Sequence, residues 1–357
     1  MFYRLAGVHH TRYETARALW PIPADRKQVI VAGLIALVAP FFLSTLYLGS
    51  YMLPWLIWSS AALSLTLLMG MAGQLHFGFA SVMAIGAYTS IHLARLGIPF
   101  ELALIGAGAM SAVIGTVFGA AALRVKGLYL VIATLAMQYL VDWVIINVPA
   151  ISGGAQATLR TPEVSFLLFP IESLTSRYYL ALGWAALLAV FLMNVKRTSF
   201  GRALTAIRDK DFAAAVIGVD PFRYKLMAFF TSSFMGGVTG AMLAFCFYRA
   251  VTPEQFSFNV SIQLVAMVLV GGLGSVIGGF LGAAFVLLIP IVLTNFVAGL
   301  AASGWLAISS NLLAHVPLMI YGALIIGFLL LEPLGLAKIY DNTRKYFLVW
   351  PFRHSRS

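Results

Sequence analysis

The sequence has little charge. Only 10% of its 357 residues are Asp, Glu, Lys or Arg, whereas 61% are apolar, and a soluble domain carries about 25% charged residues. No charged residue occurs within 28–94 or within 255–331, and each run is several times the roughly 20 residues that cross hydrocarbon. A soluble core of that size would need a charged shell that the rest of the chain does not supply. The sequence therefore predicts an all-α, polytopic transmembrane helical bundle.

The sequence lacks the residues that several kinds of chemistry require. Cys246 is the single cysteine, which excludes an internal disulfide. No Gly-x-x-x-x-Gly-Lys-Ser/Thr run is present, so this chain does not bind ATP through that motif. His76 has no Cys, Asp or Glu at metal-ligand spacing. We expect no catalytic site, no metal site and no cofactor in this chain.

Gly, Pro and charge clusters divide the apolar sequence into about ten candidate spans. They are 29–48, 52–72, 75–94, 99–123, 128–148, 178–194, 226–248, 259–273, 275–299 and 313–331. The segment 259–273 is short for a span and precedes a Gly-rich turn, so a re-entrant segment is the alternative there. The expected organisation is a cytoplasmic N-terminal segment, 1–28, a transmembrane domain, 29–332, with a cytoplasmic loop, 195–225, and a basic cytoplasmic tail, 333–357.

The positive charges indicate an orientation. With the N-terminus inside, 19 of the 23 Lys and Arg residues fall in predicted cytoplasmic segments and 4 fall outside. This is the bias that the positive-inside rule requires. The sequence thus predicts that both termini are cytoplasmic, and a topological cause for the net charge of +11.

Two polar stretches interrupt the apolar spans. Residues 69–88 combine repeated glycines with Gln74 and His76, and freed backbone groups are tolerable in a membrane only against protein or a water-filled path. Close helix packing through small residues is the alternative. Farther along, Thr134, Gln138 and Asp142 recur every four residues, so they share one helix face that must point inward. Asp142 lines a path or lies at the hydrated outer surface.

These stretches supply the candidate residues of a translocation pathway. They are Gly73, Gln74, His76, Phe77, Phe79, Ser81, Tyr88, Thr134, Gln138 and Asp142.

Residues 196–218 are too polar to span and too rich in alanine to be a loop. Ser199 can cap a helix and Gly218 can end it. Small apolar side chains beside Asp209 and Asp211 favour docking into a protein groove over lying on lipid headgroups.

Several separated motifs resemble the LivM-type permease subunits of branched-chain amino acid ABC importers. The matching pieces, in the family's order, are 73–88, 123–135, Ser152-Gly153-Gly154, 199–209, Gly271-Gly272-Leu273-Gly274-Ser275 and Tyr321-Gly322.

The resemblance implies a permease subunit of an ATP-driven importer in a bacterial-type inner membrane. Its partners would be a second related permease, two cytoplasmic ATPases that bind ATP and Mg, an extracytoplasmic solute-binding protein and membrane lipid, with no nucleic acid. The residues implied in coupling to the ATPases are Gly201, Arg202, Ile207, Arg208, Asp209, Asp211 and Gly218. Those of the outer loop that would meet the binding protein are Gly153, Gly154 and Gln156, although a plain connector is the alternative there.

The sequence also departs from the family. It reads His76-Phe77-Gly78-Phe79-Ala80 where members commonly show a Ser-Leu-Gly-His-type run. An aromatic or aliphatic acid, an amide or urea is therefore an alternative solute. Rivals from other classes are an ion-coupled secondary transporter using Asp142 or Glu332, and a membrane-embedded enzyme using His76 or His315 with Asp142.

Overall fold

The computed structural model describes residues 23–125, 127–154, 157–166, 169–302, 319–320, 322–328, 330, 332 and 334–349. Gln156, His315 and the start of the tenth predicted span lie outside the described residues.

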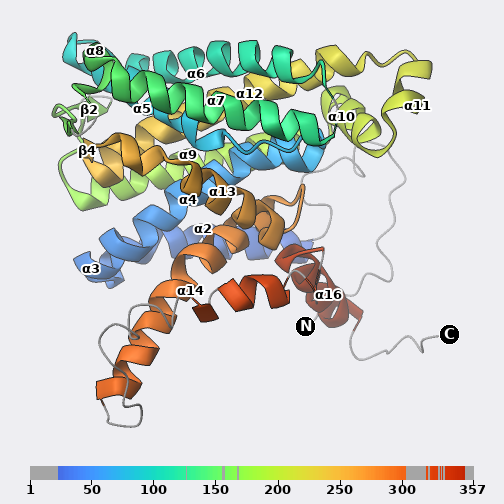
Figure 1. The fold of residues 1–357 in the computed structure, drawn as a ribbon. Helices are drawn as coiled ribbons and strands as arrows, with labels where there is room; N and C mark the ends of the chain where they lie inside the picture. The colour runs from blue at the N-terminus through green and yellow to red at the C-terminus, as the bar shows by residue number, and fades with distance from the viewer. Residues whose placement is uncertain are drawn as a thin grey trace.

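The described chain is a bundle of helices with four very short strands at one end (Figure 1). The helices of the first half are α2 (Pro23–Phe42), α3 (Thr45–Tyr47), α4 (Leu53–Thr66), α5 (Phe79–Arg95), α6 (Phe100–Ala122), α7 (Leu128–Asn147) and α8 (Pro149–Ser152). Those of the second half are α9 (Leu174–Val195), α10 (Ser199–Asp209), α11 (Asp211–Val216), α12 (Pro221–Met242), α13 (Phe258–Gly271), α14 (Val276–Ala302) and α16 (Leu336–Val349). Three π-helical stretches, η1 (Leu48–Met52), η2 (Leu67–Met71) and η3 (Leu243–Tyr248), and a 3₁₀ turn, η4 (Pro253–Phe256), extend them.

The structure confirms an all-α membrane bundle but not the count of ten spans. In the described residues seven helical stretches are long and apolar enough to cross a membrane: Thr45–Met71, Phe100–Ala122, Tyr129–Asn147, Leu174–Val195, Pro221–Tyr248, Pro253–Gly271 and Val276–Val297. The third predicted span, 75–94, forms a helix of only 17 residues, because residues 72–78 are not helical. The segment 259–273 gives a helix of 14 residues, α13, which reaches spanning length only with η4.

Helix α4 lies at the centre of the bundle. All its residues except Trp55 are buried, as expected of a helix that is apolar on every side. Its small residues let α9, α12 and α14 approach closely. Polar groups tie it to two of these neighbours, because Ser232 Oγ donates to Ser64 O at 2.7 Å and Trp55 Nε1 donates to Phe280 O at 3.0 Å.

Glycines set the contact between α5 and α12. A Cβ atom added to Gly86 would lie 2.1 Å from Gly237 O, and one added to Gly240 would lie 2.0 Å from Met83 O. The two backbones therefore touch, as in small-residue packing of membrane helices. Helix α6 joins them, and Gly115 of α6 leaves just enough room for Ser233 of α12.

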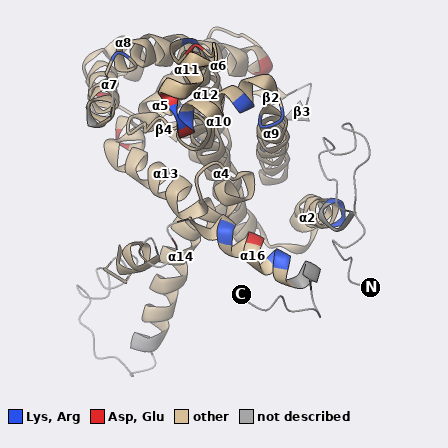
Figure 2. Ribbon diagram, turned by 90° about the vertical axis from the view of Figure 1, so that its right-hand side faces the viewer, with Lys and Arg blue, Asp and Glu red and all other residues tan. Residues whose placement is uncertain are grey.

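The two ends of the bundle differ in structure and charge. One end carries two antiparallel pairs, β1 (Leu159–Arg160) with β4 (Ala250–Val251) and β2 (Ser165–Phe166) with β3 (Phe169–Pro170). The other end carries α10, α11 and α16, and Figure 2 views the molecule from that side. The described cations of this second end are Arg26, Lys27, Arg124, Lys196, Arg197, Arg202, Arg208, Lys210, Arg223, Lys225, Lys338, Arg344 and Lys345, whereas Arg95, Arg160, Arg177 and Arg249 lie towards the strand end.

Candidate functional site

The chain leaves helical geometry between η2 and α5, inside the predicted translocation motif. Gly73 adopts φ +67°, a left-handed conformation that disfavours any other residue. Gln74 folds back on this turn and donates from Nε2 to Ala72 O at 3.0 Å. The segment 72–78 therefore separates η2 from a helix that begins inside the bundle, and we call it the broken segment.

Side chains from other helices satisfy the free N–H groups at the start of α5. Thr134 Oγ1 accepts from Phe77 N at 3.1 Å, and Gln138 Oε1 accepts from Ser81 N at 3.0 Å. Ser261 Oγ of α13 accepts from Ala80 N at 2.9 Å and itself donates to Gln138 Oε1 at 2.9 Å. Unpaired N–H groups at a helix start are costly away from water, so these contacts fix where α5 begins.

This arrangement explains the predicted polar face of α7. The face does point inward, because Thr134 and Gln138 are both buried. Gln138 Nε2 also donates to Phe256 O and to Asp142 Oδ1, each at 2.9 Å. The amide therefore joins α5, α7, η4 and α13 at one point.

The remaining pathway candidates differ in burial. His76, Phe79, Ser81 and Tyr88 are buried, Phe77 is half-buried, and Gly73 is exposed. His76 Nδ1 accepts from Gly78 N at 3.1 Å, and its ring lies between Phe79 and Phe229, with centroid distances of 5.8 and 5.7 Å.

The position of Asp142 follows from the length of α7. This helix has 20 residues, which span about 30 Å and match the hydrocarbon thickness of a bilayer. Gln138 lies at its middle and Asp142 about 6 Å farther towards the strand end. Asp142 is half-buried and accepts through Oδ1, while no described residue contacts its Oδ2 in a hydrogen bond.

The predicted docking helix is two helices. Its cap is Thr198, whose side chain accepts from Gly201 N at 3.2 Å, and not Ser199 as the sequence suggested. The helix breaks at Lys210, which is extended. Asp211 begins α11, where the helix dipole favours a carboxylate, whereas Asp209 ends α10, where a carboxylate is disfavoured, and pairs with Arg208 at 3.4 Å. Gly218, with φ +90°, lies just after α11 as expected.

Helix α10 packs against the bundle through its apolar face. Gly201, Leu204 and Ile207 are buried, whereas Arg202 and Asp209 are exposed. A Cβ atom at Gly201 would lie 2.1 Å from Val195 O, so only glycine permits this approach.

Arg208 connects α10 directly to the broken segment. Its Nη1 donates to Gly70 O at the end of η2. Its Cγ would be 2.7 Å from a Cβ atom at Gly73, so the aliphatic part of the side chain lies on that turn. Gly70 in turn contacts the backbone of Gly274, in the turn between α13 and α14. The structure thus brings a predicted coupling residue onto the predicted pathway motif.

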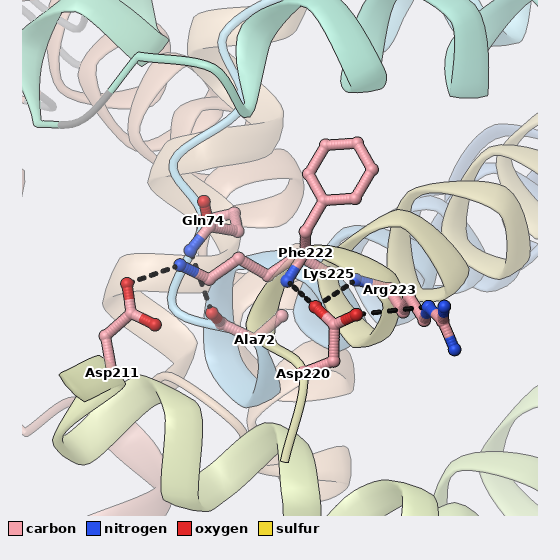
Figure 3. A network of polar contacts seen from close by, with 7 residues as sticks. All are labelled: Ala72, Gln74, Asp211, Asp220, Phe222, Arg223 and Lys225. Atoms are coloured by element: carbon pink, nitrogen blue, oxygen red, sulfur yellow. Dashed lines mark hydrogen bonds and ion pairs between the residues drawn. The ribbon is translucent and has the colours of Figure 1, made fainter. Parts of the chain in front are cut away.

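A cavity of about 560 Å³ lies beside this junction. Its walls are the 73–75 stretch, the α6–α7 connection, α11 and the start of α12. Lys225 Nζ pairs with Asp211 Oδ2 at 3.2 Å across it, and Asp220 caps α12 by accepting from Phe222 N at 3.0 Å (Figure 3). The ion pair holds α11 against α12.

Two sets of residues were missed from the sequence. Helix α11 and the residue after it expose three large apolar side chains, Phe212, Val216 and Ile217. Helix α13 exposes two amides, Asn259 and Gln263, four residues apart. Their spacing on one helix face was the available signal.

In the outer loop, two of the three residues predicted to meet the binding protein, Gly153 and Gly154, lie within the described residues. Gly153 and Gly154 have φ +84° and +114°. The buried Ser152 hydroxyl accepts from Gly154 N at 3.1 Å and donates to Ile145 O, which ties the turn to α7. Among the described residues, no three His, Cys, Asp or Glu side chains gather where a metal ion could bind.

Together these features define a multi-pass membrane protein in which a peripheral amphipathic helix contacts an interrupted membrane helix. Residues 47–329 match the family described as branched-chain amino acid transport system / permease component, and the chain belongs to that family.

Individual relatives agree with this assignment. The high-affinity branched-chain amino acid transport system permease protein LivM of Escherichia coli (strain K12) is 32% identical over 279 residues, which cover 70% of this chain and 64% of the relative. LivM of Salmonella typhimurium is 32% identical over 239 residues, 60% of this chain and 56% of the relative. The autoinducer 2 import system permease protein LsrC of Klebsiella pneumoniae is 30% identical over 149 residues, 37% of this chain and 42% of the relative. The alignments with LivM thus span less than two thirds of those relatives. No solved structure matches the chain significantly.

Proposed function

We propose that this chain is a permease subunit of an ABC importer that moves branched-chain amino acids or related small solutes into the cytoplasm. It would work with a second permease, two ATPases that bind ATP and Mg, and an extracytoplasmic binding protein that meets the outer loop at Gly153, Gly154 and Gln156. The contact of Arg208 with Gly70 carries the proposal. Through this contact and that of the Arg208 side chain with Gly73, a movement of α10 imposed by an ATPase reaches η2 and the broken segment without an intervening flexible loop.

The orientation follows the charges. The cation-rich end with α10, α11 and α16 would face the cytoplasm and the strand end would face outward. Both termini would then be cytoplasmic.

The ATPase would sit on α10 and α11. Phe212, Val216 and Ile217 are 83%, 71% and 75% exposed beside charged neighbours. Apolar patches rimmed by charge are typical of protein contacts, and this one lies next to the residue that reaches the broken segment.

The ten candidate residues of the pathway have different roles in this proposal. They are Gly73, Gln74, His76, Phe77, Phe79, Ser81, Tyr88, Thr134, Gln138 and Asp142. Thr134, Gln138 and Ser81 hold the start of α5. Gly73 and Gln74 shape the turn that Arg208 contacts.

The test is co-purification of the ATPases with the full chain from membranes. Phe212→Asp should release the ATPases, because it places a charge in the apolar contact. Leu96→Asp, at an equally exposed apolar residue of the opposite end, should leave them bound. Equal retention of the ATPases by both variants would contradict the docking surface, and the absence of any ATPase with the unaltered chain would contradict the importer.

A further inference from the structure

The exposed amides of Asn259 and Gln263 lie at the middle of the membrane. Ser261, between them on α13, donates to Gln138 Oε1, and Gln138 is the midpoint of α7. At 1.5 Å per residue, each amide is about 3 Å along the helix from this level. Neither forms a hydrogen bond with any described residue.

Other exposed amides of the described helices lie elsewhere. Asn147 and Asn194 are at the ends of α7 and α9, and Asn295 lies about 28 Å along α14 from its start. Gln28, near the start of α2, accepts from Tyr340 of α16, and Asn342 lies in α16 itself. Such positions reach the headgroup region. The pair on α13, near the middle of the membrane, does not reach the headgroup region.

Lipid is not a suitable neighbour for this face. An unpaired amide in hydrocarbon loses its hydrogen bonds to water without replacement, and polar side chains inside membranes face protein or a water-filled cavity. The exposed stripe of α13 runs through Asn259, Ile262 and Gln263, so it is both polar and open.

The Asp142 carboxylate is connected through Gln138 to the residue two positions before α13. Gln138 donates to Asp142 Oδ1 and to Phe256 O, two residues before α13, and the ring centroids of Tyr139 and Phe258 are 5.8 Å apart. No Lys or Arg occurs in α7 or α13. Direct burial of this face against an apolar surface of a second subunit would leave the Asp142 charge without water or a counter-ion.

We propose that Asn259, Gln263 and Asp142 line a water-filled path at mid-membrane and bind the zwitterionic head of an amino acid there. Asp142 Oδ2 accepts from the ammonium group, and the two amides donate to the carboxylate. This assignment deepens the function proposed above and rests on it.

The test is thiol labelling in the assembled transporter. Cys246 is buried, and in a Cys246→Ala background Asn259→Cys and Gln263→Cys are compared with Val113→Cys. Val113 is an exposed apolar residue near the middle of α6. A charged, water-soluble methanethiosulfonate should modify the α13 cysteines at least about 100-fold faster than the control, because thiolates react only where water reaches them. If the α13 cysteines react as slowly as Val113→Cys, water does not reach them and the proposed path is wrong.

Competition with leucine tests whether the ligand of this site is an amino acid. Excess leucine should slow the labelling, whereas urea, which has no carboxylate, should not. Labelling that leucine leaves unchanged overturns the amino-acid site. Asp142→Asn should raise the KM for leucine about tenfold. An unchanged KM overturns the role of the carboxylate. Labelling reports water access whether or not the chain works in an importer. The proposed function is tested separately, because it would be contradicted if the unaltered complex showed no ATP-driven uptake.

Discussion

Removal of the Arg208 guanidinium should uncouple ATP hydrolysis from transport. Arg208→Ala deletes the hydrogen bond to Gly70 O and the contact with Gly73. A hydrogen bond with a charged donor contributes about 1.5–3 kcal/mol. The Arg208 side chain is 41% exposed, so water recovers part of this, and about 1–2 kcal/mol of coupling is expected to be lost. Because 1.4 kcal/mol is a factor of ten, solute moved per ATP should fall about 5- to 30-fold.

The assay is uptake and ATP hydrolysis measured together in proteoliposomes that contain the whole complex. Arg223→Ala is the matched control, since it removes a cation from the same end of the bundle. Arg223 is 82% exposed and pairs only locally with Asp220, at 3.1 Å, and exposed pairs contribute little. Equal loss of coupling in both variants, or an unchanged ratio in Arg208→Ala, would refute the mechanical link. Unchanged subunit stoichiometry confirms that assembly is intact.

Two stability predictions follow from the packing. Gly86→Ala forces a methyl group onto Gly237 O, and overpacking of this kind costs about 1–3 kcal/mol. The thermal midpoint of unfolding should therefore drop. The control is Gly183→Ala in α9, which has open space around it and should not lower the midpoint. Gln138→Leu leaves Ser81 N and Phe256 O without partners and should destabilise the chain by at least about 2 kcal/mol. Asn147→Ala, which removes only a local bond to Trp143 O, should cost far less in the same thermal unfolding measurement.

The class of fold was predictable because solvent preference is encoded in composition. Runs without charge predicted the membrane bundle, and the four-residue spacing of Thr134, Gln138 and Asp142 predicted an inward face that the structure confirms. The number of spans was not predictable in the same way. Gly73 and Gln74 marked the break between the second and third predicted spans, but nothing in residues 75–78 showed that α5 begins only at Phe79.

The contacts between distant segments were the main omission. The sequence indicated a docking helix at 199–218 and a pathway motif near Gly73, but it contained nothing to show that Arg208 joins them. Ser261 was equally hidden, because a lone serine in an apolar helix most often bonds to its own backbone. Such contacts depend on how α10, α13 and α5 are placed in space, which no local pattern encodes.

The proposed function requires that this chain imports solute only when an ATPase drives it. The measurement that tests it most directly is uptake of labelled leucine into proteoliposomes that hold the unaltered chain with its co-purified partners, in the presence of the binding protein and of ATP on the α10 side. ATP should drive accumulation of leucine against its gradient, and a non-hydrolysable analogue should not. Accumulation by this chain without ATPases, driven by an ion gradient, would contradict the account and identify a secondary transporter.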